Sequence, residues 1–297
     1  MLYLFDNRTF KFLERKGIHI TPVKWFHPIP DTQKIPQDIW QRENALPGIE
    51  MRVNEMIDRA KRWKQRFGAE YDAFPREGSK ESPQFYLGNK NYGSIDAESL
   101  YCFVRESKPK RIVEIGSGHS SRLTLQALDL NKKEDSTYSP EFTLIDPYVH
   151  SYLAPVLKSR SDVNWIEKGV QDVPMETFTQ LGQGDILFID SSHVLTINSD
   201  VQYEFLQILP RLNPGVLVHV HDIFFPHEYP EHWIKKNMRF YNEQYILQAF
   251  LTHNARAQVR WAGYYMHVKQ PAVLRECFKS YPEIPNVCPG SFWFQTT

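Results

Sequence analysis

Short apolar runs alternate with longer polar, helix-forming stretches between residues 111 and 220, and this alternation limits the fold more than any other feature of the chain. A strand–helix alternation is the signature of a parallel sheet with helices on both faces. We therefore predict an α/β fold with a doubly wound, mostly parallel sheet. The expected strands are 111–115, 142–145, 163–166, 185–189 and 216–220, and the expected helices between them include 120–129 and 201–212.

The sequence before and after residues 111–220 indicates how the chain divides into an extension and a domain. The first 50 residues are rich in proline, which disfavours long helices. Apolar residues then recur at spacings of three and four over 49–67, the pattern of an amphipathic helix. We expect an N-terminal extension or lid over 1–91 and one cofactor-binding domain over 92–297. Further elements are expected at 94–107 (helix) and at 258–261 and 264–268 (strands).

The charge balance narrows the class of partner. Lys plus Arg and Asp plus Glu both number 35, so no basic excess points to nucleic acid or to a membrane surface. A small molecule is the expected partner, and the sequence leaves a homo-oligomer open. The three cysteines have no metal-ligand spacing, and residues 1–19 lack the apolar stretch of a signal peptide, so we expect a soluble cytoplasmic protein.

A glycine-containing loop follows the first expected strand. Gly116 and Gly118 allow a tight turn and a close approach to a ligand, and the next helix offers its N-terminal amides. A dinucleotide fingerprint would place Gly or Ala at Ser121 and an apolar residue at Glu114. An acid before the glycines would repel a pyrophosphate, but it accepts hydrogen bonds from an ammonium group. S-adenosylmethionine carries an ammonium group and no phosphate.

Two further acids extend this expected cofactor site. Asp146 ends the second strand, where a carboxylate can accept hydrogen bonds from both ribose hydroxyls. After the third strand, Asp172 or Gln171 could bind the adenine amino group. Together the residues predicted to bind the cofactor are Glu114, Gly116, Ser117, Gly118, Ser120, Asp146, Asp172 and Asp190.

The order of these motifs resembles the Rossmann-like class I S-adenosylmethionine-dependent methyltransferases over about Tyr92 to Val268. Within that class, the segments 96–98, 114–120, 189–193 and 221–222 resemble the small-molecule O-methyltransferase branch related to macrolide-sugar methyltransferases. The resemblance implies a histidine base, a sugar-like acceptor and a divalent metal (Mg, Mn or Fe). It places the metal on Asp190, His221 and Asp222. Since His221 stands where that branch has a carboxylate, a metal softer than magnesium, or none, is expected.

The ends of the fourth and fifth strands carry the expected chemistry. Asp190 ends an apolar strand, and His193 follows it by three residues. Methyl transfer to oxygen requires loss of the hydroxyl proton, and a histidine can take that proton near neutral pH. We therefore predict His193 and Asp190 as catalytic residues. A metal on Asp190, His221 and Asp222 would lower the pKa of the hydroxyl further.

Other interpretations stay open at this point. His219 and His221 alternate along the fifth strand and could both be core histidines. The segment 223–233, rich in aromatic residues and proline, is expected to line the acceptor pocket, or else to be a packed loop. The alternative functions are a nicotinamide-dependent oxidoreductase, a metal-dependent hydroxylase or hydrolase, and an S-adenosylmethionine-binding scaffold without catalytic activity.

Overall fold

A computed structural model describes residues 6–79, 84–284 and 287–297. The chain divides into two compact units. Unit 1 combines residues 1–42 with 228–240, and unit 2 combines residues 43–227 with 241–297. The residues predicted to bind the cofactor and those predicted to act in catalysis all fall in unit 2.

Unit 2 is built on a seven-stranded sheet with the order β3-β2-β1-β4-β5-β7-β6. Strands β1 to β5 are parallel, and β7 pairs antiparallel with both β5 and β6. This is the predicted doubly wound, mostly parallel sheet. The strands are β1 (Arg111–Ile115), β2 (Glu141–Ile145), β3 (Val163–Ile166), β4 (Ile186–Ile189), β5 (Leu217–Val220), β6 (Ala257–Ala262) and β7 (Phe292–Thr296).

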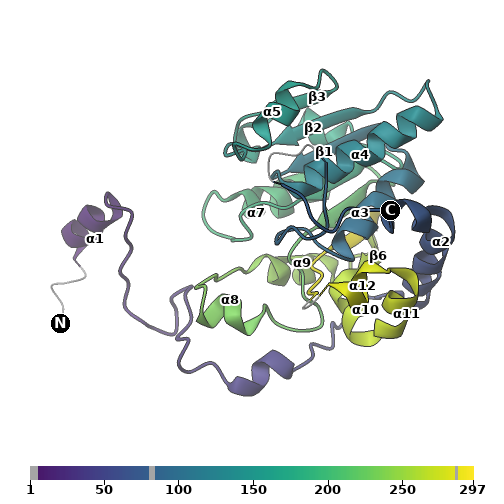
Figure 1. Ribbon diagram of the computed structural model, residues 1–297. Coiled ribbons are helices and arrows are strands. Elements are labelled where there is room, and N and C mark those ends of the chain that lie inside the picture. The colour runs from purple at the N-terminus through teal and green to yellow at the C-terminus, as the bar shows by residue number, and fades with distance from the viewer. Residues whose placement is uncertain (1–5, 80–83, 285–286) are drawn as a thin grey trace. The chain divides into compact units, whose positions relative to one another are not determined.

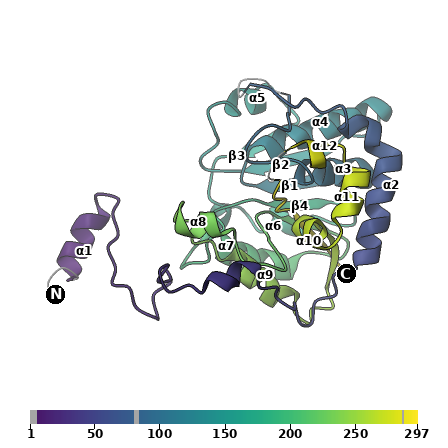
Figure 2. The ribbon, with the colours of Figure 1, turned by 60° about the horizontal axis from the view of Figure 1, so that its bottom comes forward.

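The central strands form because their apolar residues are buried on both faces of the sheet. All residues of β4 and β5 are buried, as expected for parallel strands covered by helices on both sides. Figure 2 shows α4 on one side of the strands and α6, α7 and α9 on the other. These helices are α4 (His119–Glu134), α6 (Glu176–Thr179), α7 (Asp200–Tyr203) and α9 (Glu243–Leu251).

The amphipathic helix predicted over 49–67 is α2 (Val53–Tyr71), which begins and ends four residues later. Its buried residues include Met56, Ala60 and Trp63, at the spacing of one helical face. It packs against α3 (Asp96–Ser107), α11 (Pro271–Cys277) and β6, so it belongs to unit 2 (Figure 1). The compact units therefore do not follow the predicted division at residue 92.

Two predicted elements differ in the structure. Residues 264–268 are not a strand but lie in a helix, α10 (Gly263–Lys269). The β6 ladder ends where the Gly263 N–H donates to the Ser291 carbonyl, and the helix then buries Met266 and brings Tyr264 and His267 together on one face. The helix predicted at 201–212 is split into α7, the π-helix η4 (Glu204–Ile208) and the 3-10 helix η5 (Leu209–Arg211).

The remaining helices are short. Unit 2 also contains α5 (Ala154–Lys158), the 3-10 helix η3 (Val170–Asp172) and α12 (Ser280–Glu283). Unit 1 contains α1 (Asn7–Glu14), the 3-10 helix η2 (Gln37–Gln41) and α8 (Glu231–Lys235), and Gln37 hydrogen-bonds to both ends of α8 through Glu231 and Lys235. Among the described residues, no helix combines the length and apolar character needed to cross a bilayer.

Candidate functional site

Gly116 turns the chain sharply after β1. Its φ of +84° lies in the region that favours glycine. A Cβ atom at this position would lie 1.9 Å from the Asp190 carbonyl oxygen, well inside van der Waals contact. The loop after β1 therefore runs directly against the end of β4, and only glycine fits there.

Gly118 plays a different part in the same loop. A Cβ atom on Gly118 would meet no atom within 4 Å, so the space beside this residue is open. Gly118 caps the N-terminus of α4, where free amide groups favour a polar ligand. Its own N–H donates to Ser121 Oγ at 3.1 Å. The loop thus offers open space and backbone donors at the predicted cofactor position.

Glu114 is buried in β1, 1% exposed. Its Oε1 atom accepts hydrogen bonds from the hydroxyls of Ser120 at 2.6 Å and Ser121 at 3.0 Å. Its Oε2 atom is buried and has no hydrogen-bond partner in the part of the chain that the structure describes. Burial raises the pKa of Glu114 to about 8. A buried carboxylate oxygen without a partner fits the ammonium group of S-adenosylmethionine, or a water bound to that group.

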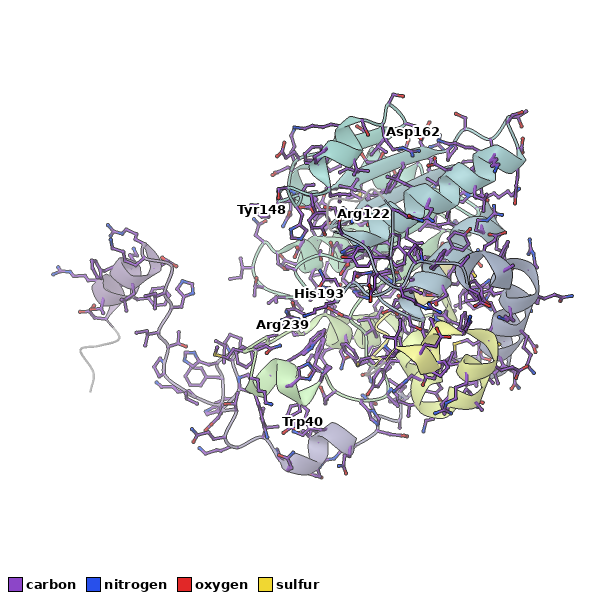
Figure 3. All side chains as sticks on the ribbon, in the orientation of Figure 1. Trp40, Arg122, Tyr148, Asp162, His193 and Arg239 are labelled. Atoms are coloured by element: carbon purple, nitrogen blue, oxygen red, sulfur yellow. The ribbon has the colours of Figure 1, made fainter. Side chains whose placement is uncertain are left out.

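Asp146 follows β2 beside the same loop. The Ser117 hydroxyl donates to its Oδ2, and the Tyr148 N–H donates to its Oδ1 at 2.7 Å. Tyr148 and His193 lie on the same side of unit 2, where the strands end (Figure 3). The structure therefore brings Glu114, Ser117 and Asp146 together, as the sequence predicted.

Asp172 is the least enclosed of the predicted cofactor residues. It is exposed at the end of η3, and its neighbour Gln171 is engaged with the Asn198 carbonyl at 2.9 Å. The role of Asp172 in binding adenine stays a prediction.

The ends of β4 and β5 carry a compact cluster of ionisable side chains. Asp190 and Asp222, the residues after these strands, both face His193 and His221. His193 Nε2 lies 3.4 Å from Asp190 Oδ1 and 3.5 Å from Asp222 Oδ2. His221 Nδ1 lies 3.3 Å and 3.6 Å from the Oδ1 atoms of the same two residues. The four residues predicted here thus form one group, which we call the strand-end cluster.

Charge compensation sets the protonation of the strand-end cluster. Burial alone would lower the pKa of each histidine, but the facing carboxylates outweigh it and raise the pKa of both His193 and His221. For Asp190, the effect of burial is likewise outweighed, and the two imidazolium groups hold its pKa well below the usual value. Burial raises the pKa of Asp222. The cluster therefore holds protons on its rings at neutral pH.

Three acids that the sequence did not assign to the site complete its surroundings. Glu243, at the start of α9, accepts a hydrogen bond from His193 Nδ1 at 2.8 Å. Asp96, at the start of α3, lies 3.4 Å from His221 Nε2 and accepts the N–H groups of Gly290 and Ser291. Glu204 accepts from Ser191. Their positions at or near helix starts could have indicated them, and Asp96 also lies in the 96–98 segment that carries the family resemblance.

His219 belongs to the core. Its ring stacks on Phe188 with a centroid distance of 3.9 Å, and its Nε2 lies 3.0 Å from Ser291 Oγ. Burial and the nearby charge of His221 lower its pKa, so the ring is neutral. The interpretation of His219 as a core histidine is confirmed, whereas His221 belongs to the strand-end cluster.

The predicted metal is not supported by this arrangement. A metal ligand must present an unprotonated ring nitrogen, and both ring nitrogens of His221 face carboxylate oxygens. Within residues 6–79, 84–284 and 287–297, no group of three or more His, Cys, Asp or Glu is arranged to hold a metal ion. Asp190, His221 and Asp222 come together as ion pairs, and we derive no chemical step through a metal.

Comparison with known proteins decides the class. A family model described as a methyltransferase domain matches residues 113–223, which run from β1 past the strand-end cluster. The chain thus carries a methyltransferase domain over the part of the sheet that holds both the glycine loop and the strand-end cluster. An uncharacterised protein of Archaeoglobus fulgidus is 29% identical to this methyltransferase over 173 residues, 56% of this chain and 75% of the relative.

Solved structures give weaker likenesses. The methyltransferase PaMTH1 of Podospora anserina, bound to S-adenosylhomocysteine, is 17% identical with a TM-score of 0.41, covering 82% of this methyltransferase and 88% of that chain. The TDP-rhamnose 3'-O-methyltransferase CalS11 is 13% identical with a TM-score of 0.41, covering 79% and 93%. At these TM-scores neither likeness assigns an acceptor.

Proposed function

We propose that this methyltransferase acts on a hydroxyl group of a small polyhydroxyl, sugar-like acceptor, with His193 as the base. The observation that carries the proposal is the position of His193 among the partly exposed carboxylates of Asp190 and Asp222, whose side chains are 28% and 17% exposed. Carboxylate oxygens at such a position can accept hydrogen bonds from neighbouring hydroxyls of one acceptor. The balanced charge of the chain supports a small molecule rather than a nucleic acid or a membrane.

The proton follows a simple path in this proposal. S-adenosylmethionine, when bound, supplies a methyl group on a positively charged sulfur. As the new C–O bond forms, the acceptor proton passes to Nε2 of His193, and the electron pair of the broken C–S bond stays on sulfur. Because the pKa of His193 is raised, its neutral form becomes abundant above neutral pH, so the rate is expected to rise with pH.

The segment after β5 supplies the proposed apolar wall of the acceptor site. Ile223, Phe224 and Phe225 are buried, and His227 Nδ1 lies 3.3 Å from the Tyr264 hydroxyl. This segment leaves the sheet directly after Asp222. We place the acceptor beside residues 223–227, which lie next to the carboxylates that would hold its hydroxyls.

An acceptor screen tests the proposal. The protein is incubated with S-adenosylmethionine and with methyl hexosides, nucleotide sugars or a catechol, and formation of S-adenosylhomocysteine is measured. We expect turnover with polyhydroxyl acceptors and little with the catechol. Cofactor binding without turnover on any acceptor would favour the scaffold, and turnover on the catechol alone would overturn the choice of acceptor.

A further inference from the structure

The start of α9 holds His193 at several atoms at once. The backbone N–H groups of Asn242 and Glu243 donate to the His193 carbonyl at 3.1 Å and 3.3 Å. The Asn242 side chain accepts the Leu195 N–H at 2.6 Å, and the Tyr241 ring lies 4.7 Å from the His193 ring between centroids. Residues 241–243 therefore fix the backbone of the 193–195 loop and one side of the histidine ring.

His193 needs this support because its backbone is strained. Its φ of +62° is in the left-handed region, which a histidine adopts at a free-energy cost. Its side chain is 8% exposed, so neither the ring nor the backbone is held by solvent. Such a conformation persists only where the surroundings determine it.

The hydrogen bond to Glu243 determines which ring nitrogen carries the proton. Glu243 is 1% exposed, and its Oε2 accepts from His193 Nδ1 at 2.8 Å. In the neutral ring this bond requires the proton on Nδ1, which leaves a lone pair on Nε2. Nε2 is the nitrogen that faces Asp190 and Asp222, at the proposed acceptor position.

We propose that Glu243 is the positioning residue for His193: it fixes the tautomer and the ring orientation in which Nε2 takes the acceptor proton. The inference rests on the proposed function of His193 as base. Glu243 touches neither acceptor nor cofactor in this proposal. A carboxylate that accepts a hydrogen bond from Nδ1 also stabilises the imidazolium that forms when Nε2 takes the acceptor proton, without itself taking the proton.

Glu204 lies behind this pair. Its Oε1 and the Oε1 of Glu243 are both buried and have no hydrogen-bond partner among the described residues, and the charge of Glu243 raises the pKa of Glu204 in addition to the effect of burial. Glu204 opens the π-helix η4, a type of distortion that often marks functional sites. A charged Glu204 would favour proton uptake by Glu243, so Glu243 keeps its charge most easily when Glu204 is neutral. The other oxygen of Glu204 accepts a hydrogen bond from the Ser191 hydroxyl.

The matched variants are Glu243→Gln, Glu243→Asp and Glu98→Gln. Gln can donate its amide N–H to Nδ1 and so favour the wrong tautomer, whereas Asp keeps an acceptor. Glu98 is an equally buried carboxyl, 1% exposed, bonded to Ser280 and to the Ile95 N–H, and it serves as the control. With methyl hexosides as acceptor, we expect Glu243→Gln to lower kcat about 100-fold with little change in KM, and Glu243→Asp to recover most of it.

An ¹⁵N spectrum of histidine-labelled protein tests the tautomer without turnover. For neutral His193 in the wild type, with S-adenosylhomocysteine added, we expect the proton on Nδ1, and in Glu243→Gln we expect a shift toward Nε2. A wild-type ring with the proton on Nε2 would overturn the inference even if the variants fail to fold. Unchanged kcat in Glu243→Gln would also overturn it. Full turnover in His193→Ala would instead overturn the proposed function and leave the tautomer result standing.

Discussion

The two halves of the site differ in how their buried charge is balanced. At the end of β1, the carboxyl group of Glu114 keeps one buried oxygen without a partner among residues 6–79, 84–284 and 287–297. At the ends of β4 and β5, two carboxylates face two imidazole rings, and each charge has an opposite neighbour. The first half offers a buried oxygen to a cation, whereas the second half already pairs its carboxylates with imidazole rings and can exchange protons. This difference assigns ligand binding to the first and proton transfer to the second.

The largest expected effect tests the proton-transferring half. His193→Ala removes the proposed base and should lower kcat by about 10²- to 10⁴-fold, since general-base catalysis contributes that much. Affinity for S-adenosylhomocysteine, measured by calorimetry, should stay within about threefold because His193 lies outside the glycine loop. His253→Ala, which removes an exposed histidine elsewhere in unit 2, serves as the control. Equal kcat in His193→Ala and the control would remove His193 from the mechanism.

A pair of glycine variants tests how the two halves are joined. Gly116→Ala places a Cβ at a φ of +84° and against the Asp190 carbonyl, so it should reduce the free energy of unfolding by more than the roughly 1–3 kcal/mol of backbone strain alone. Gly118→Ala meets no atom and should unfold within a few degrees of the wild type, but bind S-adenosylmethionine more weakly because the methyl group occupies open space beside the cofactor loop. Thermal unfolding separates the two. Equal loss of stability in both variants would contradict this geometry.

Glu114→Gln tests the ligand-binding half. The variant keeps an oxygen for Ser120 and Ser121 but cannot ionise when the ammonium group binds. We expect affinity for S-adenosylmethionine to fall about 10- to 100-fold, the range of one hydrogen bond to a charged group. Titration calorimetry measures the loss, with Glu98→Gln as a control for removal of a buried acid. An unchanged dissociation constant would place the cofactor amine elsewhere.

The pH dependence of stability should change in the same variant. The pKa of Glu114 is raised to about 8 in the folded state from 4.5. Between these values the folded state holds a proton that the unfolded state has lost, so this group's contribution to stability is full below pH 4.5 and is lost as pH rises toward 8. Denaturant unfolding should show a steeper fall over this range in the wild type than in Glu114→Gln. Parallel curves would contradict the raised pKa.

The smallest expected effect concerns metal. Because the rings of the strand-end cluster face carboxylates rather than a shared centre, treatment with EDTA should change kcat less than twofold. Activity is measured with and without added manganese after dialysis. A large loss restored by manganese would show that Asp190, His221 and Asp222 rearrange around a metal when the cofactor and acceptor bind.

The sequence predicted the two halves unequally, for a physical reason. Glu114, Gly116, Gly118 and Asp146 follow directly from strand ends and a turn, and local backbone geometry brings them together. The partner of His193 is Glu243, which is 50 residues away and is placed by the packing of α9. Likewise, Asp96 reaches His221 from α3, 125 residues away. No periodicity or short motif records such contacts.

The same distinction explains the error at 264–268. Its aromatic and β-branched residues favour a strand locally, but the ladder with β7 ends at Ala262 and the chain becomes helical to bury Met266. Residues 292–296, in contrast, form β7 because their backbone pairs with both β5 and β6 and the consecutive aromatic side chains of Phe292, Trp293 and Phe294 are buried. Tertiary packing, rather than local propensity, decided both segments.

The central claim is that the loop from Glu114 to Gly118 binds S-adenosylmethionine. Thermal unfolding with saturating S-adenosylmethionine, S-adenosylhomocysteine or a nicotinamide dinucleotide tests it most directly. At one hundred times the dissociation constant, a ligand stabilises the folded state by about 2.7 kcal/mol. We expect the two adenosyl compounds alone to raise Tm, and Glu114→Gln to reduce that rise. No rise with either compound, or a rise with the dinucleotide only, would contradict the account.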